Sequence, residues 1–284
     1  GKIIAKAFSS VGDNGVVMME ESENDETTVE LIEGTEYEKG LKNMHFVTNQ
    51  TNGTADLENP LVLLVDSEIE NIRKIQAILE YAIKEKRSLL IIADVDQQVL
   101  SALAMNKLKG NLKVNVIDAP TYGVHKKQIL DDLALITGAT VVDENLGDDL
   151  DLISPDFLGT CTKTVTSQTN TIIQLNEMPK AVQKLTLEIK KQHDAENNVT
   201  KKNKLERRLA RLSAKVAIVK VGANSEVELK EKLDRVEDAI CATKAAIKEG
   251  IVPGGGIALL DASNIVSKDN KSEAALLEAI KAPY

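Results

Sequence analysis

The chain has 284 residues, of which 43% are hydrophobic and only 2% aromatic, so its core must be built mainly from aliphatic side chains. The formal net charge of −9 disfavours nucleic acid and anionic membranes as partners, because both bind positively charged surfaces. No apolar run reaches the roughly 18 residues needed to span a bilayer. Cys161 and Cys241 lie far apart, without metal-ligand spacing, which favours free thiols in a reducing cytoplasm.

Residues 1–32 are expected to form a helix followed by strands. The segment VVMMEE, residues 16–21, reads as a strand, and the acidic stretch after it is either a solvated strand pair or a loop. Apolar residues before Gly12 recur at helical spacing and predict a buried stripe. That stripe comprises Ile3, Ile4, Ala7 and Phe8.

Residues 60–143 carry the clearest pattern, in which continuous apolar strands alternate with amphipathic helices. Such alternation predicts βαβ units and a parallel sheet covered on both faces. No phosphate-binding glycine motif follows any of the strands, which argues against a dinucleotide or P-loop site in this layer. The expected strands are 61–66, 89–94, 112–118 and 140–143. Three helices are expected between them. The first has Ile72, Ile75, Leu79, Ala82 and Ile83 on one face, and the other two span 96–109 and 126–137.

Residues 158–176 read as further strands, and residues 178–213 as a charged helical hairpin with a polar connection at 192–200. The charges of this hairpin are interpreted as a solvated face. Two apolar stripes would bury the helices. They consist of Val182, Leu185 and Ile189, and of Leu205, Leu209 and Leu212.

A strand at 216–222 leads into a long helix that ends near three consecutive glycines. Ser225 and Glu228 have the spacing of a capping box at its start. Asp238 falls off the expected buried stripe, and the glycines 254–256 can bring backbone N–H groups close to a ligand. This pattern is either half of a nucleotide-hydrolysing site or a solvated Asp followed by an ordinary helix end. The expected stripe is Val236, Ala239, Ile240 and Ile247.

Many segments in this order resemble a group I chaperonin, the bacterial GroEL type, over essentially the full length of the chain. They include runs from every part of the sequence. The matching segments are 1–17, 33–40, 57–66, 89–94, 112–123, 136–144, 203–213, 220–246 and 249–259.

The resemblance implies an α/β fold, α+β overall, in which an apical domain is inserted into a small α+β intermediate domain. The apical domain would hold a parallel-containing sheet flanked by helices. The chain opens without Met and reads as a piece of a longer protein that lacks the phosphate loop. The implied layout is 1–32 and 216–249 for the intermediate domain, 33–215 for the apical domain and 250–284 for the start of the equatorial domain.

The resemblance also implies a protein-folding ATPase. Asp238 matches the carboxylate that positions the attacking water, and Gly255 matches a nucleotide-contacting glycine. ATP and Mg²⁺ are expected in the full-length protein, which would form rings of seven subunits, usually doubled. The piece in hand is expected to be monomeric, inactive and free of both cofactors.

An apolar apical groove is expected to bind unfolded polypeptides and a GroES-type co-chaperonin lid. Polar or small residues replace the family's larger apolar ones at several of its positions, which would weaken apolar contact. Ala214 and Lys215 replace a Gly-Gly hinge, while Gly34 keeps the glycine of the other hinge strand. The groove positions are Leu41, His45, Phe46, Gln76, Leu79, Leu100, Ala104 and Met105.

Two other functions remain open at this point. A divergent apical domain would be a binding module that holds one partner without folding it. An unrelated α/β enzyme would need a catalytic cluster at the strand ends, where Asp66, Asp94 and Asp118 are the candidates.

Overall fold

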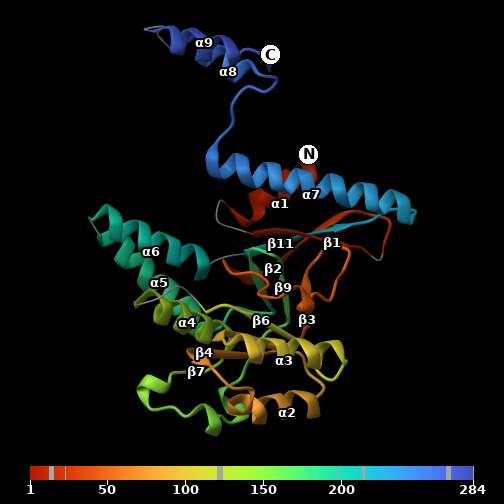
Figure 1. The fold of residues 1–284 in the computed structure, drawn as a ribbon, viewed down its shortest axis with the longest axis vertical. Helices are drawn as coiled ribbons and strands as arrows, with labels where there is room; N and C mark the ends of the chain where they lie inside the picture. Colours follow the sequence, from red (N-terminus) through yellow and green to blue (C-terminus); the bar gives the residue numbers. More distant parts are fainter. Residues whose placement is uncertain are drawn as a thin grey trace. The chain divides into compact units, whose positions relative to one another are not determined.

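The computed structural model describes residues 1–12, 16–22, 24–119, 124–196, 198–212, 215–266 and 270–283 (Figure 1). The chain divides into two compact units. The first unit is Gly1–Leu229 and the second is Lys230–Tyr284.

One sheet of the first unit combines strands from distant parts of the chain. Helix α1 (Lys2–Val11) packs against it and buries Ile4 and Ala7, whereas Ile3 of the predicted stripe is 41% exposed. The acidic stretch ends in strand β2, but it is not a strand pair, because β11 lies between β1 and β2 and pairs with both. The strands lie in the order β1 (Val16–Glu21), β11 (Lys215–Val221), β2 (Thr28–Tyr37), β10 (Thr171–Leu175), β9 (Lys163–Thr166) and β3 (Ala55–Glu58).

Strand β2 changes partner part-way along its length. Its residues 28–33 pair with β11 on one side, and residues 33–37 pair with β10 on the other. Glu33 is the residue at which the two registers overlap. The predicted boundary between the intermediate and apical domains, at residues 32 and 33, therefore lies inside one continuous strand. It falls at the point where the pairing of β2 passes from β11 to β10.

Gly34 lies at this change of ladder and is held in a tight space. A Cβ atom at this position would lie 2.6 Å from the Ile173 carbonyl oxygen and 3.0 Å from Val216 Cγ2. These atoms belong to β10 and β11 respectively, so both ladders converge on Gly34. Close packing alone thus accounts for a glycine here.

The second sheet confirms the predicted parallel layer. Its strands carry continuous apolar runs because both faces are covered by helices. The parallel strands lie in the order β6 (Val114–Ile117), β5 (Leu89–Val95), β4 (Leu61–Ile69) and β7 (Val141–Val142), and β8 (Gly159–Thr160) pairs antiparallel with β4.

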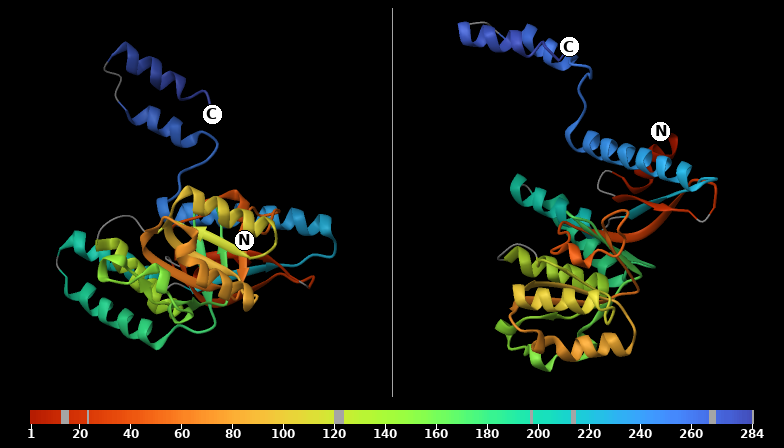
Figure 2. Two further views of the ribbon diagram at one scale, coloured as in Figure 1. Left: turned by 60° about the horizontal axis from the view of Figure 1, so that its bottom comes forward. Right: turned by 45° about the vertical axis from the view of Figure 1, so that its right-hand side comes forward.

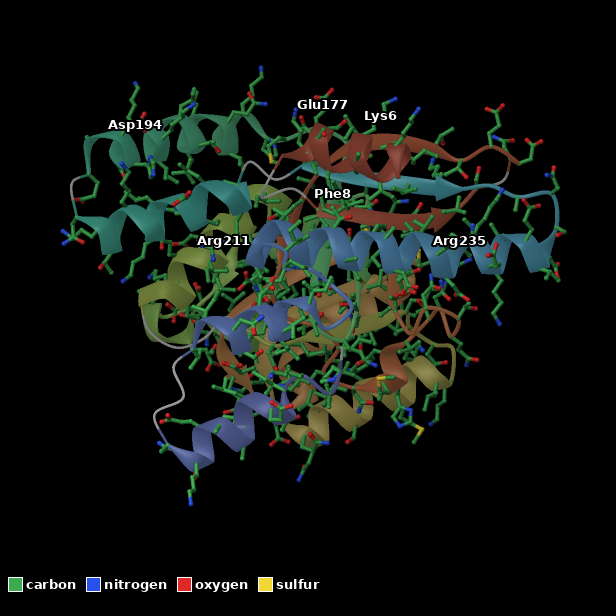
Figure 3. All side chains as sticks on the ribbon, turned by 90° about the horizontal axis from the view of Figure 1, so that it is seen from above. Lys6, Phe8, Glu177, Asp194, Arg211 and Arg235 are labelled. Atoms are coloured by element: carbon green, nitrogen blue, oxygen red, sulfur yellow. The ribbon has the colours of Figure 1, made fainter. Side chains whose placement is uncertain are left out.

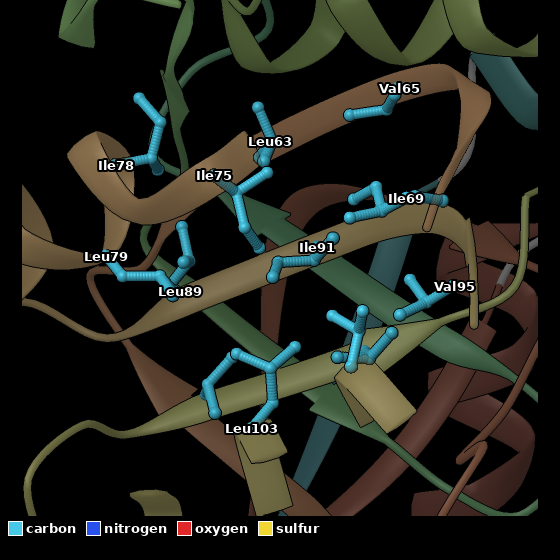
Figure 4. Packing of buried hydrophobic residues seen from close by; sticks show 14 of the residues in the cluster. Leu63, Val65, Ile69, Ile75, Ile78, Leu79, Leu89, Ile91, Val95 and Leu103 are labelled. Carbon is cyan, nitrogen blue, oxygen red and sulfur yellow. The ribbon is translucent and has the colours of Figure 1, made fainter. Parts of the chain in front are cut away.

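Helices α2 (Gln76–Lys84) and α3 (Gln97–Leu108) cover one face of this sheet (Figures 1 and 2). The 3-10 turn η2 (Ile72–Ile75) precedes α2. Ile75, Ile78 and Leu79 pack onto the apolar residues of β4 and β5 (Figure 4). The prediction for this helix is wrong at Ile83, which is 46% exposed, because Ile78 occupies the buried side instead.

The opposite face is covered by α4 (Val124–Thr137) and by the predicted helical hairpin, which the structure confirms. The hairpin consists of α5 (Lys180–Ala195) and α6 (Val199–Leu212), which pack together. Val182, Ile189 and Leu212 are buried in this layer. Arg208 of α6 donates from Nε and Nη2 to both carboxylate oxygens of Asp132 on α4, at 2.6 to 3.2 Å.

Helix α7 (Glu226–Glu249) begins in the first unit and continues into the second, which also contains α8 (Ile257–Ile265) and α9 (Lys271–Ala279). Ser225 caps α7 by accepting from the Glu228 N–H at 3.3 Å, as predicted. The Glu228 carboxylate accepts from the Asn224 N–H at 3.1 Å. Ile247 of the predicted stripe is 47% exposed, so that part of the prediction is wrong. Among the described residues, no helix is both long and apolar enough to cross a membrane.

Candidate functional site

Most of the predicted polypeptide-contacting residues gather around one aliphatic cluster beneath α2 and α3. Phe46 is fully buried, Leu100 is 2% exposed and Leu79 is 9% exposed. Leu41 is half-buried against the same cluster, and its N–H donates to the Ser167 carbonyl at 2.9 Å. Phe46, Leu79 and Leu100 therefore do not face solvent, and Leu41 is only partly covered. The buried members are Phe46, Leu79, Leu100 and Ala104.

The remaining predicted residues lie at the surface. His45 is exposed on the 3-10 turn η1 (Met44–Phe46), and Met105 on α3 is 53% exposed. Gln76 is exposed at the start of α2, where its amide donates to Glu80 Oε1 at 2.7 Å. The structure therefore separates the predicted set into a buried floor and a few exposed side chains.

Two exposed apolar residues beside them were not predicted. Met44 on η1 is 59% exposed and Leu108 on α3 is 58% exposed. Turn η1 packs against α3, and Lys107 Nζ of α3 donates to the Val47 carbonyl, just after η1, at 2.6 Å. The sequence signal for Leu108 was its spacing of three residues from Met105, which places both on one side of a helix. We call Met44, His45, Met105 and Leu108 the η1–α3 surface.

Local capping fixes the elements that carry this surface. The Asn43 side chain accepts from the His45 N–H at 2.9 Å and starts η1. The Asp96 side chain accepts from the Gln98 N–H at 2.7 Å and starts α3. Burial lowers the pKa of Lys107, whose ammonium group reaches back to η1. A rigid frame thus presents flexible Met and Leu side chains, which adapt to apolar groups of different shapes.

The predicted hinge residues are only partly described. Lys215 is the exposed first residue of β11 and pairs with Glu33. Gly34 is closely packed between β10 and β11. Ala214 lies outside the described residues.

Asp238 and Gly255 lie in the second unit, at different places along it. Asp238 is exposed in the middle of α7, about 16 Å along the axis from the end of that helix. Gly255 has a φ of 65° and precedes Gly256, which starts α8. Apart from Gly255 and its two chain neighbours, no heavy atom of the described residues lies within 4 Å of the position that a Cβ atom would take at Gly255.

Both positions are exposed. The exposed Asp238 carboxylate can accept hydrogen bonds from water, and the open backbone at Gly255 allows close approach of a ligand. In the part of the chain that the structure describes, no group of three or more His, Cys, Asp or Glu side chains is placed to bind a metal.

The aspartates at the strand ends are engaged in ion pairs. Lys126 Nζ lies 3.2 Å from Asp66 Oδ1 and 3.1 Å from Asp94 Oδ2, and Lys42 lies 2.5 Å from Asp118. Burial alone would lower the pKa of Lys126, but its hydrogen bonds to Asp94 and Asp66 raise it overall. The two contacts of Lys126 tie α4 to β4 and β5, which is a structural role for Asp66 and Asp94.

Cysteine reactivity gives a test of the packing between the two sheets. Cys161 is 7% exposed and burial raises its pKa to about 12, although Arg87 opposes the shift, whereas Cys241 is exposed. A thiol reagent at mildly alkaline pH is expected to modify one cysteine rapidly and the second only after unfolding in guanidinium. Cys241→Ser should remove the fast phase. Two equally fast phases in the native protein would contradict the buried position of Cys161.

Comparison with protein families agrees with these features. A profile of the TCP-1/cpn60 chaperonin family matches residues 1–281. The matched residues extend through both compact units. The chain belongs to the TCP-1/cpn60 chaperonin family.

Proposed function

We propose that residues 33–215 act as a GroEL-type apical domain that captures unfolded polypeptides on the η1–α3 surface. Chaperonins as a family bind unfolded polypeptides and assemble into rings. The observation that carries the proposal is the exposure of Met44, Met105 and Leu108 beside a fully packed core. Exposed apolar side chains without directional contacts favour many guests over one sequence.

The η1–α3 surface, together with Gln76, combines apolar and polar side chains, which affects the affinity for guest polypeptides. His45 lies among the apolar residues, and Gln76 at the start of α2 holds its amide on Glu80. We infer that guests with interrupted apolar stretches suit this surface better than purely apolar ones. The same surface would receive the mobile loop of a GroES-type lid.

In the complete protein we propose that ATP supplies the free energy for guest release and that rings contain seven subunits, usually doubled. The Asp238 carboxylate would accept a hydrogen bond from the attacking water and orient it. Gly255 would let the nucleotide approach the backbone. A cytoplasmic location accords with two free thiols.

Capture of a chemically denatured, fluorescently labelled protein tests the apical role. Met44→Ser together with Met105→Ser is expected to weaken capture about tenfold, because both side chains lose apolar contact with the guest. The fold should persist, since both residues are more than half exposed. Capture should change little with salt, because apolar contact carries it.

Leu146→Ser together with Leu152→Ser is the matched control, since these leucines are 70% and 78% exposed but lie on the turns η3 (Glu144–Leu146) and η4 (Leu150–Leu152). Equal losses in both double variants would refute a specific role for the η1–α3 surface. Tight binding of a single protein from a panel would favour the binding module instead.

A further inference from the structure

The α5–α6 hairpin is basic in an otherwise acidic chain. Residues 180–212 contain ten Lys and Arg against four Asp and Glu, a net charge of +6, whereas the whole chain carries −9. Composition alone concealed this concentration. Figure 3 shows the two helices side by side, with Asp194 and Arg211 labelled on them.

A cavity of about 620 Å³ lies where this hairpin meets α4. Lys201 and Lys204 line it from α6, and Gln128 of α4 and Gln192 of α5 add amide groups. Leu205 contributes an apolar wall. The cavity therefore combines positive charge, hydrogen-bonding amides and aliphatic surface.

Among the described residues, the two lysines of this cavity take part in no ion pair. Arg208 also lines it, but its guanidinium is paired with Asp132. Glu196 lines it too, and its carboxylate accepts from the Asn198 N–H at 2.9 Å. Within the described chain, neither Lys201 nor Lys204 has a carboxylate at ion-pair distance, and both are exposed.

We propose that this cavity binds an acidic, aliphatic segment of polypeptide, separate from the η1–α3 surface. Lys201 and Lys204 are three residues apart on one helix, so their Cβ atoms are about 5–6 Å apart. An extended peptide places alternate side chains about 6.6 Å apart on one face. Alternate Asp or Glu residues would thus each meet one lysine, while Gln128 and Gln192 bond to the peptide backbone.

The chemistry of the cavity favours polypeptide over nucleic acid. Residues 180–212 contain no Phe, Tyr or Trp on which bases could stack, and Glu188 and Glu206 interrupt the basic run. The rest of the chain is acidic and repels a long polyanion. A short segment with aliphatic side chains between its carboxylates matches the wall formed by Leu205.

Fluorescence anisotropy with a labelled peptide of alternating Glu and Ala tests the proposal. Lys201→Glu together with Lys204→Glu is expected to weaken binding about tenfold, because each change replaces an ion pair with repulsion. Raising the salt from about 0.05 M to about 0.5 M should weaken binding to the unchanged protein, since exposed pairs are screened. Both lysines are exposed, so circular dichroism should show an unchanged fold.

Lys184→Glu together with Lys191→Glu is the matched control, with the same change in net charge on exposed positions of α5. An equal loss in this control, or equal binding of an alternating Gln and Ala peptide, overturns the proposal. Tighter binding of a single-stranded oligonucleotide also overturns it, in favour of nucleic acid.

The inference rests on the proposed function only in taking polypeptide as the ligand, and the two can fail separately. Met44→Ser with Met105→Ser should leave binding of the Glu and Ala peptide unchanged. If these changes abolish it, the peptide binds at the η1–α3 surface, so the second site is wrong while the apical role stands. If only the lysine variant weakens binding of both the denatured protein and the Glu and Ala peptide, the proposed role of the η1–α3 surface is wrong instead.

Discussion

Replacing Asp238 with Ala in the complete chaperonin polypeptide is expected to lower ATP turnover at least about 100-fold, the usual contribution of a positioned proton acceptor. ATP binding should persist, because the carboxylate contacts water in the proposed mechanism. Asp238 is exposed in the middle of α7, so its removal leaves no cavity and should not unfold the helix. Single-turnover hydrolysis and equilibrium nucleotide binding measure the two effects separately.

The neighbouring carboxylate provides the control for this experiment. Glu237 is also exposed on α7 but projects about 100° away around the helix axis. Glu237→Ala removes the same charge and should keep most of the turnover. If both variants hydrolyse ATP at the normal rate, Asp238 has no role in orienting water.

Arg208→Ala is expected to destabilise the first unit by about 3–5 kcal/mol, since it leaves a buried carboxylate without its partner. The Asp132 side chain is 5% exposed and accepts all of its described side-chain bonds from Arg208. Thermal unfolding followed by circular dichroism should show a fall in Tm of about 10 °C.

Two further variants separate burial from charge. Arg208→Met together with Asp132→Leu should cost much less than Arg208→Ala, because it replaces a buried ion pair with apolar packing. Arg235→Ala breaks an exposed pair with Glu231 on α7 and should change stability by less than about 1 kcal/mol. If Arg208→Ala is as mild as Arg235→Ala, water reaches Asp132 in the folded protein.

The sheet of parallel strands was predictable because its strands read as continuous apolar runs between amphipathic helices. Burial of individual apolar residues was harder to predict. Leu100 and Met105 lie on the same helix and are both apolar, yet one is 2% and the other 53% exposed. Which side of α3 meets the core depends on how α3 crosses β5 and β6, and residue type alone does not specify that packing.

The cavity on the hairpin could not have been predicted from local sequence. Gln128, Gln192 and Lys204 are far apart along the chain and meet only after α4, α5 and α6 pack together. The capping of α7 by Ser225 was predictable, because it depends on residues only three positions apart. Asp238 and Gly255 were placed by resemblance to the family, and their roles remain proposals.

The change of partner along β2 has a mechanical consequence. The ladder with β11 and the ladder with β10 share only Glu33. A rotation of β11 relative to β10 can therefore be taken up by the backbone dihedral angles near Glu33, and the hydrogen bonds of both ladders can stay intact. Strand β2 then twists about its own axis at this point. The atoms of Ile173 and Val216 that lie close to Gly34 limit the extent of this twist by steric contact.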